Sequence, residues 1–305
     1  MLDNPQESAA APWRFNTESL SHEDEPLVTR SPRGGNFWDA RGNKRSFRPE
    51  DAYRGLARTA SPFGAMPKAV EHLLATLRGF VIYDPQTSIL RGTQTDLLQR
   101  DPLGVQGGRL ADAIEALRES EKGAQALAEA RELLGWTSDI GVDSPTPDLV
   151  SPSIPVATKI IRFADRYMRS DRNLLSAYDA SEGALYVLFA LALLFHPRAP
   201  RFFAIENIDH ALHPRLARAL VERIGTHAKA SRRQVILTTH NPLVLDGLRL
   251  ADDDIRLFTV ERTEAGHTVV GRVEYSEALR KAEESGLTLS QMWTRGLLGA
   301  VPDLW

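Results

Sequence analysis

Apolar positions in the second half of the chain follow two alternating patterns. Helix-length segments at 182–195 and 214–229 alternate with short strand-like runs at 201–205 and 234–239, and two more strand-like runs follow at 254–262 and 267–274. Continuous apolar strands separated by helices are typical of a parallel sheet with helices on its faces. The pattern therefore predicts an α/β fold whose sheet is mainly parallel and flanked by helices.

The first half has weaker periodicity. Residues 1–65 are rich in proline, glycine, serine, arginine and aspartate and predict loops or short strands. A helix is predicted over 66–79, a short strand over 80–85 (FVIYDP), an exposed helical insert over 109–134 and a linker over 141–157. These patterns divide the chain into three predicted regions: a loop-rich N-terminal segment (1–65), a partial N-terminal lobe with the helical insert and the linker (66–157) and a C-terminal lobe (158–305).

The composition limits the partners, the metal sites and the cellular compartment that this chain can have. The 305 residues carry a net charge of −3 and 42% hydrophobic residues, so the chain can fill a core and shows no overall basic field that would indicate nucleic acid. It has no cysteine, which excludes disulfides and thiolate metal sites and suits a reducing compartment. No apolar run approaches the ~20 residues of a membrane span, and the N-terminus lacks a secretory pattern. We predict a cytoplasmic protein with no membrane segment.

Polar residues stand at the ends of two predicted strands. In RFFAIENIDHALHP, residues 201–214, a predicted apolar strand is followed directly by Glu206. The next predicted strand, QVILTT, is followed directly by His240. Open α/β sheets bind ligands at the carboxyl ends of their strands. A carboxylate there suits Mg²⁺, which prefers oxygen donors, and an imidazole can reach a terminal phosphate. Taken alone, Glu206 is better explained as a solvated strand end and His240 as a structural residue.

A third polar element precedes the long apolar helix. DASEGALY, residues 179–186, offers Ser181 as a helix N-cap and Gly183 as a point of close approach in the first turn. A helix N-terminus presents free N–H groups and the positive end of a dipole, which favour an anion. Taken alone, this segment is better explained as an ordinary capped core helix.

In this order and spacing, the elements resemble the C-terminal half of an ABC-type ATPase head. The branch is the AAA-family group related to chromosome-maintenance (SMC-like) and overcoming-lysogenization (OLD) ATPases. The resemblance is strongest over 160–275. It aligns Ser181 and Gly183 with the ABC signature, Glu206 with the first Walker B acid and His240 with the switch histidine.

The resemblance implies a P-loop NTPase core, incomplete at its N-terminus, that uses ATP and Mg²⁺. Glu206 would hold the Mg²⁺ through water, and Asp209 would lie in the turn that links subunits. Nucleotide would be sandwiched between two subunits, so that its arrival or hydrolysis closes or opens a homodimer. The resemblance also admits DNA or an effector protein as a partner, in DNA repair and maintenance or in anti-phage defence.

Asn207 departs from the ABC pattern, which places at this position a glutamate that polarises the attacking water. An amide can orient water but cannot accept its proton, and such general-base help is typically worth ~10²–10⁴ in rate. Some relatives in the resembled branch carry Glu-Asn here, so the site need not be inactive. With Glu206, Asn207 and His240 as catalytic residues, we expect hydrolysis that is slow or triggered by a partner.

The phosphate-binding loop is missing from the sequence. No GxxxxGK[ST] occurs, and the nearest stretch, GGNFWDARGNKRS at 34–46, fails on spacing because Asn43 separates Gly42 from Lys44. Three explanations stay open: the sequence is a fragment, a partner supplies the missing lobe, or the protein is a pseudo-ATPase. The last explanation makes a non-hydrolysing scaffold or interaction module the alternative function.

An acidic run, ADDDIR at 251–256, raises the question of a metal nuclease, because relatives in the lysogenization branch carry a Toprim nuclease domain. That domain needs a glutamate on an earlier strand, a spaced Asp-x-Asp and more chain than follows Asp254. The run therefore predicts a loop before the next strand.

Overall fold

The computed structural model describes residues 2–3, 14–31, 33–38, 43–47 and 67–299. The chain forms two compact units, Met1–Gly79 and Phe80–Trp305. Part of the predicted loop-rich segment lies outside the described residues. The region boundaries at 65/66 and 157/158 stay predictions.

The described residues of the first unit form short antiparallel strands and the helix α2. Its four-stranded sheet has the order β3–β4–β5–β6, and a small core forms around Val28. Arg30 is buried there and pairs with Glu18 at 2.5 Å. The elements are β1 (Leu2–Asp3), β2 (Arg14–Phe15), β3 (Glu18–His22), β4 (Glu25–Ser31), β5 (Gly34–Trp38), β6 (Lys44–Phe47) and α2 (Lys68–Arg78).

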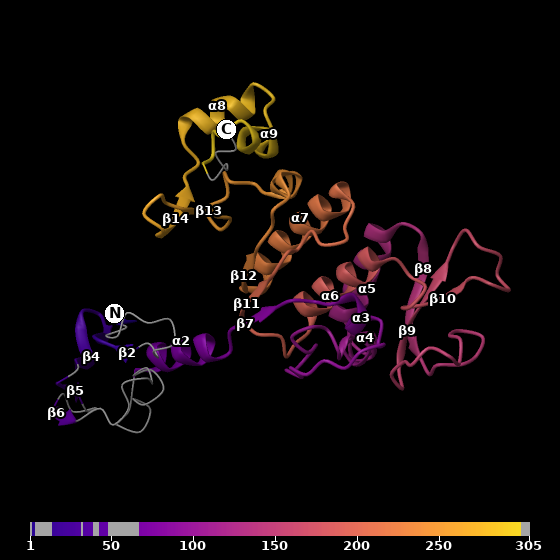
Figure 1. Ribbon diagram of the computed structural model, residues 1–305, viewed down its shortest axis with the longest axis horizontal. Helices are drawn as coiled ribbons and strands as arrows, with labels where there is room; N and C mark the ends of the chain where they lie inside the picture. Colours follow the sequence, from indigo (N-terminus) through magenta and orange to yellow (C-terminus); the bar gives the residue numbers. More distant parts are fainter. Residues whose placement is uncertain (1, 4–13, 32, 39–42, 48–66, 300–305) are drawn as a thin grey trace. The chain divides into compact units, whose positions relative to one another are not determined.

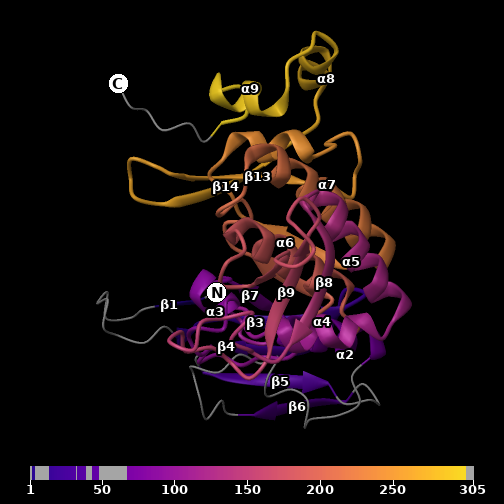
Figure 2. The same ribbon diagram turned by 90° about the vertical axis from the view of Figure 1, so that its right-hand side faces the viewer.

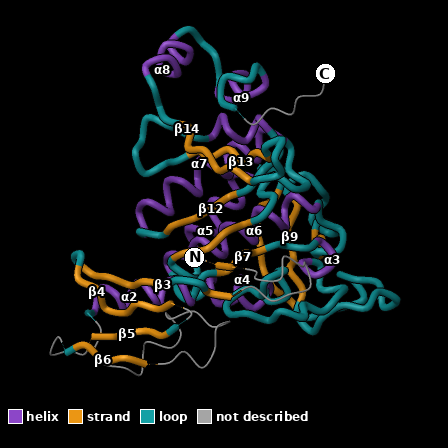
Figure 3. Tube along the Cα trace, turned by 60° about the vertical axis from the view of Figure 1, so that its left-hand side comes forward, coloured by secondary structure: helices purple, strands orange, loops and turns teal. Residues whose placement is uncertain are grey.

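A three-stranded parallel sheet organises the second unit (Figure 1). β11 (Phe202–Ile205) lies between β7 (Val81–Tyr83) and β12 (Gln234–Leu237). The register pairs Ile205 with Tyr83 on one side and with Leu237 on the other. The carboxyl ends of all three strands therefore meet at one edge. Figure 3 shows β7 and β12 as orange segments of this unit.

Helix α6 (Glu182–Phe195) forms the centre of the core. Its sequence is almost wholly apolar, and every residue from 183 to 194 is buried, so the helix is enclosed on all sides. Ser181 caps its start by accepting a hydrogen bond from the Ala184 N–H at 3.3 Å. Phe189 meets the ring of Tyr83 edge-on at 5.8 Å. The predicted helix over 182–195 is confirmed.

Arg233 caps the C-terminal end of α6. The Arg233 guanidinium donates to the carbonyls of Leu193, Leu194 and His196 at 2.9, 2.6 and 2.8 Å. The last carbonyls of a helix have no partner within the helix, so these bonds satisfy groups that burial would otherwise leave unpaired. Because Arg233 directly precedes β12, the contact also fixes the start of that strand against α6.

The remaining elements of the second unit are helices and antiparallel strands. They are α3 (Thr87–Leu90), α4 (Leu110–Arg118), α5 (Glu121–Leu134), β8 (Thr137–Asp143), β9 (Ile160–Asp165), β10 (Leu174–Ser176), α7 (Pro214–Ser231), a 3₁₀ helix (Pro242–Gly247), β13 (Leu257–Arg262), β14 (Thr268–Val273), α8 (Glu277–Glu284) and α9 (Leu289–Thr294). The helices among the described residues include none with the length and apolar character that a membrane crossing requires.

Two predictions about the architecture need correction. The sheet is not mainly parallel: outside β7, β11 and β12, the paired strands are antiparallel. The helical stretch over 109–134 is not one exposed helix. It breaks at Ser120, which caps α5, and α4 and α5 pack apolar faces that include Ile114 and Ala130 into the main core. The alternating Ala and Glu residues hid that buried face.

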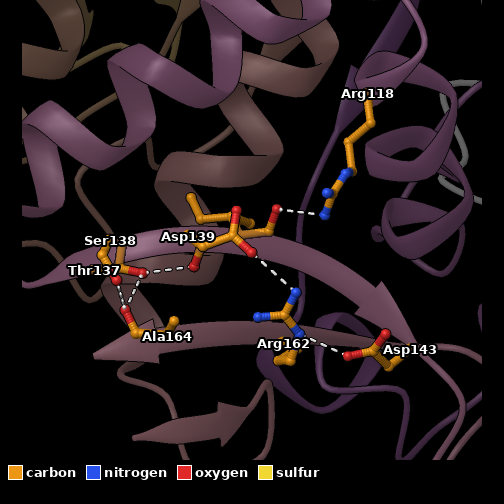
Figure 4. A network of polar contacts seen from close by, with 8 residues as sticks. Arg118, Thr137, Ser138, Asp139, Asp143, Arg162 and Ala164 are labelled. Atoms are coloured by element: carbon orange, nitrogen blue, oxygen red, sulfur yellow. Dashed lines mark hydrogen bonds and ion pairs between the residues drawn. The ribbon is translucent and has the colours of Figure 1, made fainter. Parts of the chain in front are cut away.

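The predicted linker over 141–157 begins as a strand. β8 pairs antiparallel with β9, and Figure 2 shows the two running side by side. Arg162 on β9 donates to Asp139 at 2.9 Å and to Asp143 at 2.6 Å, both on β8 (Figure 4). Arg118 reaches the same strand and donates to the carbonyl of Ile140 at 3.1 Å. One guanidinium therefore bridges two carboxylates along β8.

Because Arg162 bridges two carboxylates, we predict that the stability of the fold depends on pH. Burial acts to raise the pKa of the Asp139 carboxyl, but the hydrogen bond and charge of Arg162, together with Arg118, outweigh it and hold the pKa below its usual value of 3.8. Such a carboxylate contributes stability at pH values above 3.8 that is lost as pH falls through the lower, folded-state pKa. Because the Asp139 side chain is 43% exposed, solvent screens the pair, and its contribution at neutral pH should be about 1 kcal/mol or less.

Arg162→Met is therefore expected to lower the free energy of unfolding at pH 7, and the deficit should shrink at pH 3. Urea unfolding at pH 7, 5 and 3 measures both quantities. Arg169→Met is the matched control, because Arg169 pairs with Asp171 while its side chain is 85% exposed. A deficit that is the same at pH 7 and pH 3 would show that Arg162 acts only through packing.

Candidate functional site

The predicted acid and imidazole follow neighbouring strands. Glu206 comes directly after β11, and its backbone N–H donates to the carbonyl of Tyr83 at 2.9 Å. His240 lies three residues beyond the end of β12. Since β11 and β12 are parallel and adjacent, both residues belong to the same edge of the sheet. Both are exposed, so a ligand from solvent can reach them.

Asn207 occupies a turn with an uncommon backbone conformation. Its φ is 48°, in the left-handed region, which asparagine adopts at lower cost than most residues other than glycine. Its N–H donates to the Thr238 hydroxyl at 2.9 Å, and the next N–H, of Ile208, donates to the Thr238 carbonyl at 3.0 Å. The turn after Glu206 is thus fixed to the end of β12, and its geometry gives a physical reason for an amide at position 207.

Asp209 is held by a threonine that the sequence reasoning did not single out. The Thr239 hydroxyl donates to Asp209 Oδ1 at 2.6 Å, and the same hydroxyl accepts the N–H of Asn241 at 3.0 Å. The available signal was the Thr-Thr pair directly before His240, where two hydroxyls end an otherwise apolar strand.

The start of α6 packs against the same turn. A Cβ added at Gly183 would lie 2.9 Å from the carbonyl oxygen of Ala211 and 3.3 Å from Leu212 Cδ2. This spacing explains the glycine in the predicted signature segment. Ala211 itself has a left-handed φ of 58°. The helix start and the turn therefore approach each other as closely as their backbones permit.

Tyr186 makes a second contact between α6 and the turn. Its ring lies 5.2 Å from the ring of His210, and its hydroxyl donates to the carbonyl of Pro85 at 2.6 Å. Burial is the main cause that raises the pKa of this hydroxyl, so it stays protonated and able to donate. Tyr186 thus ties the loop after β7 to the turn after β11.

The predicted site residues divide into two groups in the structure. Glu206, Asn207, Asp209 and His240 lie on the connected ends of β11 and β12. Gly183 contacts the turn at Ala211, whereas the Ser181 hydroxyl caps its own helix and its residue is exposed. None of these contacts assigns a catalytic role, and the roles stay predictions.

A magnesium ion fits this edge only with help from a ligand. The described residues contain no group of three or more histidine, aspartate or glutamate side chains arranged to hold a metal ion. Glu206 offers one carboxylate, so Mg²⁺ there would take its other oxygens from phosphate and water, as it commonly does. The chemistry of a single strand-end carboxylate is compatible with that arrangement.

The acidic run at 251–256 is a turn. Lys229 of α7 pairs with Asp252 at 2.8 Å and with Asp254 at 2.9 Å. The hydrogen bonds that Lys229 donates to Asp252 and Asp254 raise the pKa of its amine. Two of the three aspartates therefore pair with one lysine, and the turn agrees with the predicted loop before a strand.

Residues 14–246 match the model of the family described as AAA domain, putative AbiEii toxin, Type IV TA system. The chain belongs to this family. The predicted resemblance to AAA-family ATPase domains is therefore confirmed. A search of curated proteins gives no match to the sequence.

Solved structures similar to this chain include SMC ATPase heads. The SMC head domain from Thermotoga maritima is 13% identical, with 85% of this chain and 75% of that chain covered and a TM-score of 0.35. An SMC head bound to the C-terminal winged-helix domain of ScpA is 13% identical, with coverages of 88% and 74% and a TM-score of 0.41. The Pyrococcus furiosus SMC head, bound to the C-terminal domain of ScpA, is 11% identical, with coverages of 87% and 76% and a TM-score of 0.39. These likenesses are distant.

Proposed function

We propose that this chain is an ATPase domain that takes MgATP at the shared edge of β11 and β12 and switches a dimer between two states. The observation that carries the proposal is the register of these strands, which delivers Glu206 and His240 to one edge. Family membership supports the nucleotide as ligand. DNA maintenance and anti-phage defence are the two settings we consider, in the cytoplasm of the cell.

In this proposal each residue at the edge has a distinct task. Glu206 would hold Mg²⁺ through water, and the ion would supply positive charge that neutralises the phosphates. His240 contacts the terminal phosphate. The Asn207 amide orients the attacking water but cannot take its proton, so hydrolysis by this chain is slow or waits for a partner.

Two further features point to an incomplete site within one chain. The sequence holds no GxxxxGK[ST]. In that motif, consecutive backbone N–H groups surround the β-phosphate, and this sequence does not offer them. Ser181, Gly183 and Asp209 lie in the segments that would face the nucleotide of a neighbouring subunit. We therefore propose weak nucleotide binding by the chain alone and stronger binding with a second copy or a partner that supplies the phosphate loop.

Glu206→Gln tests the proposal. The full chain is titrated with a fluorescent ATP analogue, with Mg²⁺ and with EDTA. We expect wild-type binding to weaken in EDTA, and the variant to bind about tenfold more weakly than wild type in Mg²⁺ and to lose the response to EDTA. Released phosphate, measured in the same samples, should accumulate slowly.

Glu222→Gln is the control for this experiment, because Glu222 is an exposed acid on α7 that pairs with Arg249 at 2.8 Å.

The absence of the phosphate loop motif favours a second function, a scaffold that binds partners without hydrolysing nucleotide. Wild-type chain that binds no analogue at millimolar concentration, alone or mixed with itself at high concentration, would exclude the ATPase proposal and leave the scaffold.

A further inference from the structure

One side-chain contact at the strand edge joins the residue before His240 to Asp209. It is the hydrogen bond from the Thr239 hydroxyl to Asp209 Oδ1 at 2.6 Å. Thr239 directly precedes His240 in the sequence, and Asp209 lies in the turn after Glu206. The bond therefore joins the segment that carries the imidazole to the turn that carries the aspartate.

The direction of this bond follows from its partners. The Thr239 hydroxyl has one proton, and the Asp209 oxygen at 2.6 Å is a much closer acceptor for it than the Asn241 carbonyl at 3.5 Å. The hydroxyl oxygen is then free to accept the Asn241 N–H at 3.0 Å. The Thr239 hydroxyl therefore contacts two groups: the side chain of Asp209 in the turn and the backbone N–H of the residue that follows His240.

The turn itself has its other anchors in the core. Ile208 is 3% exposed and Leu212 is 9% exposed, so both ends of the segment 208–212 are buried. Ala211 is backed by Gly183 of α6. Asp209 lies between these anchors and is only partly buried, so its carboxylate takes its position from the hydrogen bond with Thr239.

We propose that Thr239 is a positioning residue that couples His240 to Asp209 through its hydroxyl. Movement of the segment around His240, when a phosphate arrives there, is passed by this bond to the turn that carries Asp209. The coupling rests on the proposed function, whereas the positioning of Asp209 by the hydroxyl does not need nucleotide.

Two substitutions separate the hydroxyl from the shape of the side chain. Thr239→Val keeps the β-branched shape and removes the hydroxyl, whereas Thr239→Ser keeps the hydroxyl and removes a methyl group. The readout is hydrogen exchange of the backbone N–H groups of His210 and Leu212 in the full chain. Their acceptors, the carbonyls of Asn207 at 2.8 Å and Asp209 at 3.1 Å, lie inside the turn, so their exchange reports the order of the turn alone.

We expect exchange of both N–H groups to be about tenfold faster in Thr239→Val, because a hydrogen bond to a charged group is lost. Thr239→Ser should stay within about threefold of wild type. In an Asp209→Ala background, Thr239→Val should add no more than about a twofold change, since its partner is already gone. Thr226→Val is the matched control, because its hydroxyl donates to a carbonyl of its own helix, that of Glu222, at 3.0 Å.

Adding MgATP to wild type and to Thr239→Val tests the coupling. We expect slower exchange of the His210 and Leu212 N–H groups in wild type and a weaker response in the valine variant. Exchange in Thr239→Val equal to wild type without nucleotide, or a serine variant as fast as the valine variant, overturns the positioning role. Wild type that does not respond to MgATP overturns the proposed function and the coupling, while a tenfold effect of valine without nucleotide still supports the positioning of Asp209.

Discussion

Phe189→Ala is expected to lower the free energy of unfolding by about 3–5 kcal/mol, the usual range for removing a buried phenylalanine. Phe189 lies in the middle of α6 and is 0% exposed. Its ring packs edge-on against Tyr83, the last residue of β7. The substitution leaves a cavity between α6 and the sheet, at a place where surrounding residues are held by both elements and cannot close in.

Urea unfolding followed by circular dichroism measures this loss. Phe258→Ala is the control, because Phe258 on β13 is 52% exposed and its removal should cost less than about 1 kcal/mol. A Phe189→Ala loss no larger than that of Phe258→Ala would contradict a core organised around α6.

Gly183→Val is expected to lower the free energy of unfolding by about 2–3 kcal/mol through overpacking. The first added atom would already lie 2.9 Å from the backbone oxygen of Ala211, and a backbone oxygen cannot swing aside as a flexible side chain does. Either the start of α6 or the turn that carries Asp209 must move. Helix propensity alone would favour valine over glycine, so the predicted sign distinguishes the clash from an ordinary helical position.

Gly225→Val is the matched control for this prediction. Gly225 lies within α7, and a Cβ there would meet Ile255 Cδ1 at 3.6 Å, an ordinary contact. We expect that variant to unfold within about 1 kcal/mol of wild type. If Gly183→Val is as stable as Gly225→Val, the close approach of the helix start to the turn is wrong.

The part of the fold that the sequence predicted is the part whose pattern is local. The apolar run of α6 has no polar interruption, and Ser181 marks its start, so its bounds follow from composition and capping. The strands β11 and β12 are short apolar runs separated by one amphipathic helix, which favours parallel neighbours. The placement of Glu206 and His240 on one edge follows from that pair.

The antiparallel sheet of β8, β9 and β10 could not be predicted in the same way. β8 reads TSDIGVD, and its stabilising partners, such as Arg162 on β9, come from a segment about twenty residues away in sequence. Nothing in the local pattern distinguishes such a strand from a polar linker. The order β10–β9–β8 depends on contacts between distant residues, which one sequence does not display.

The sequence showed which polar residues follow the strands β11 and β12, but it did not show how these residues are hydrogen-bonded to one another. The polar strand ends were visible, and their roles stay predictions. The bonds of Thr238 and Thr239 to the turn were missed, because a hydroxyl at a strand end has many partners open to it until the neighbouring strand is placed.

The register of β11 and β12 restricts how the gene can change. Inserting or deleting one codon in either strand would shift its tip by about 3.3 Å and turn every following side chain to the opposite face. Glu206 and His240 would then no longer share an edge, even though both residues would still be encoded. Across related genes, length differences should therefore accumulate in the segments between these strands, and the strands themselves should keep their residue count.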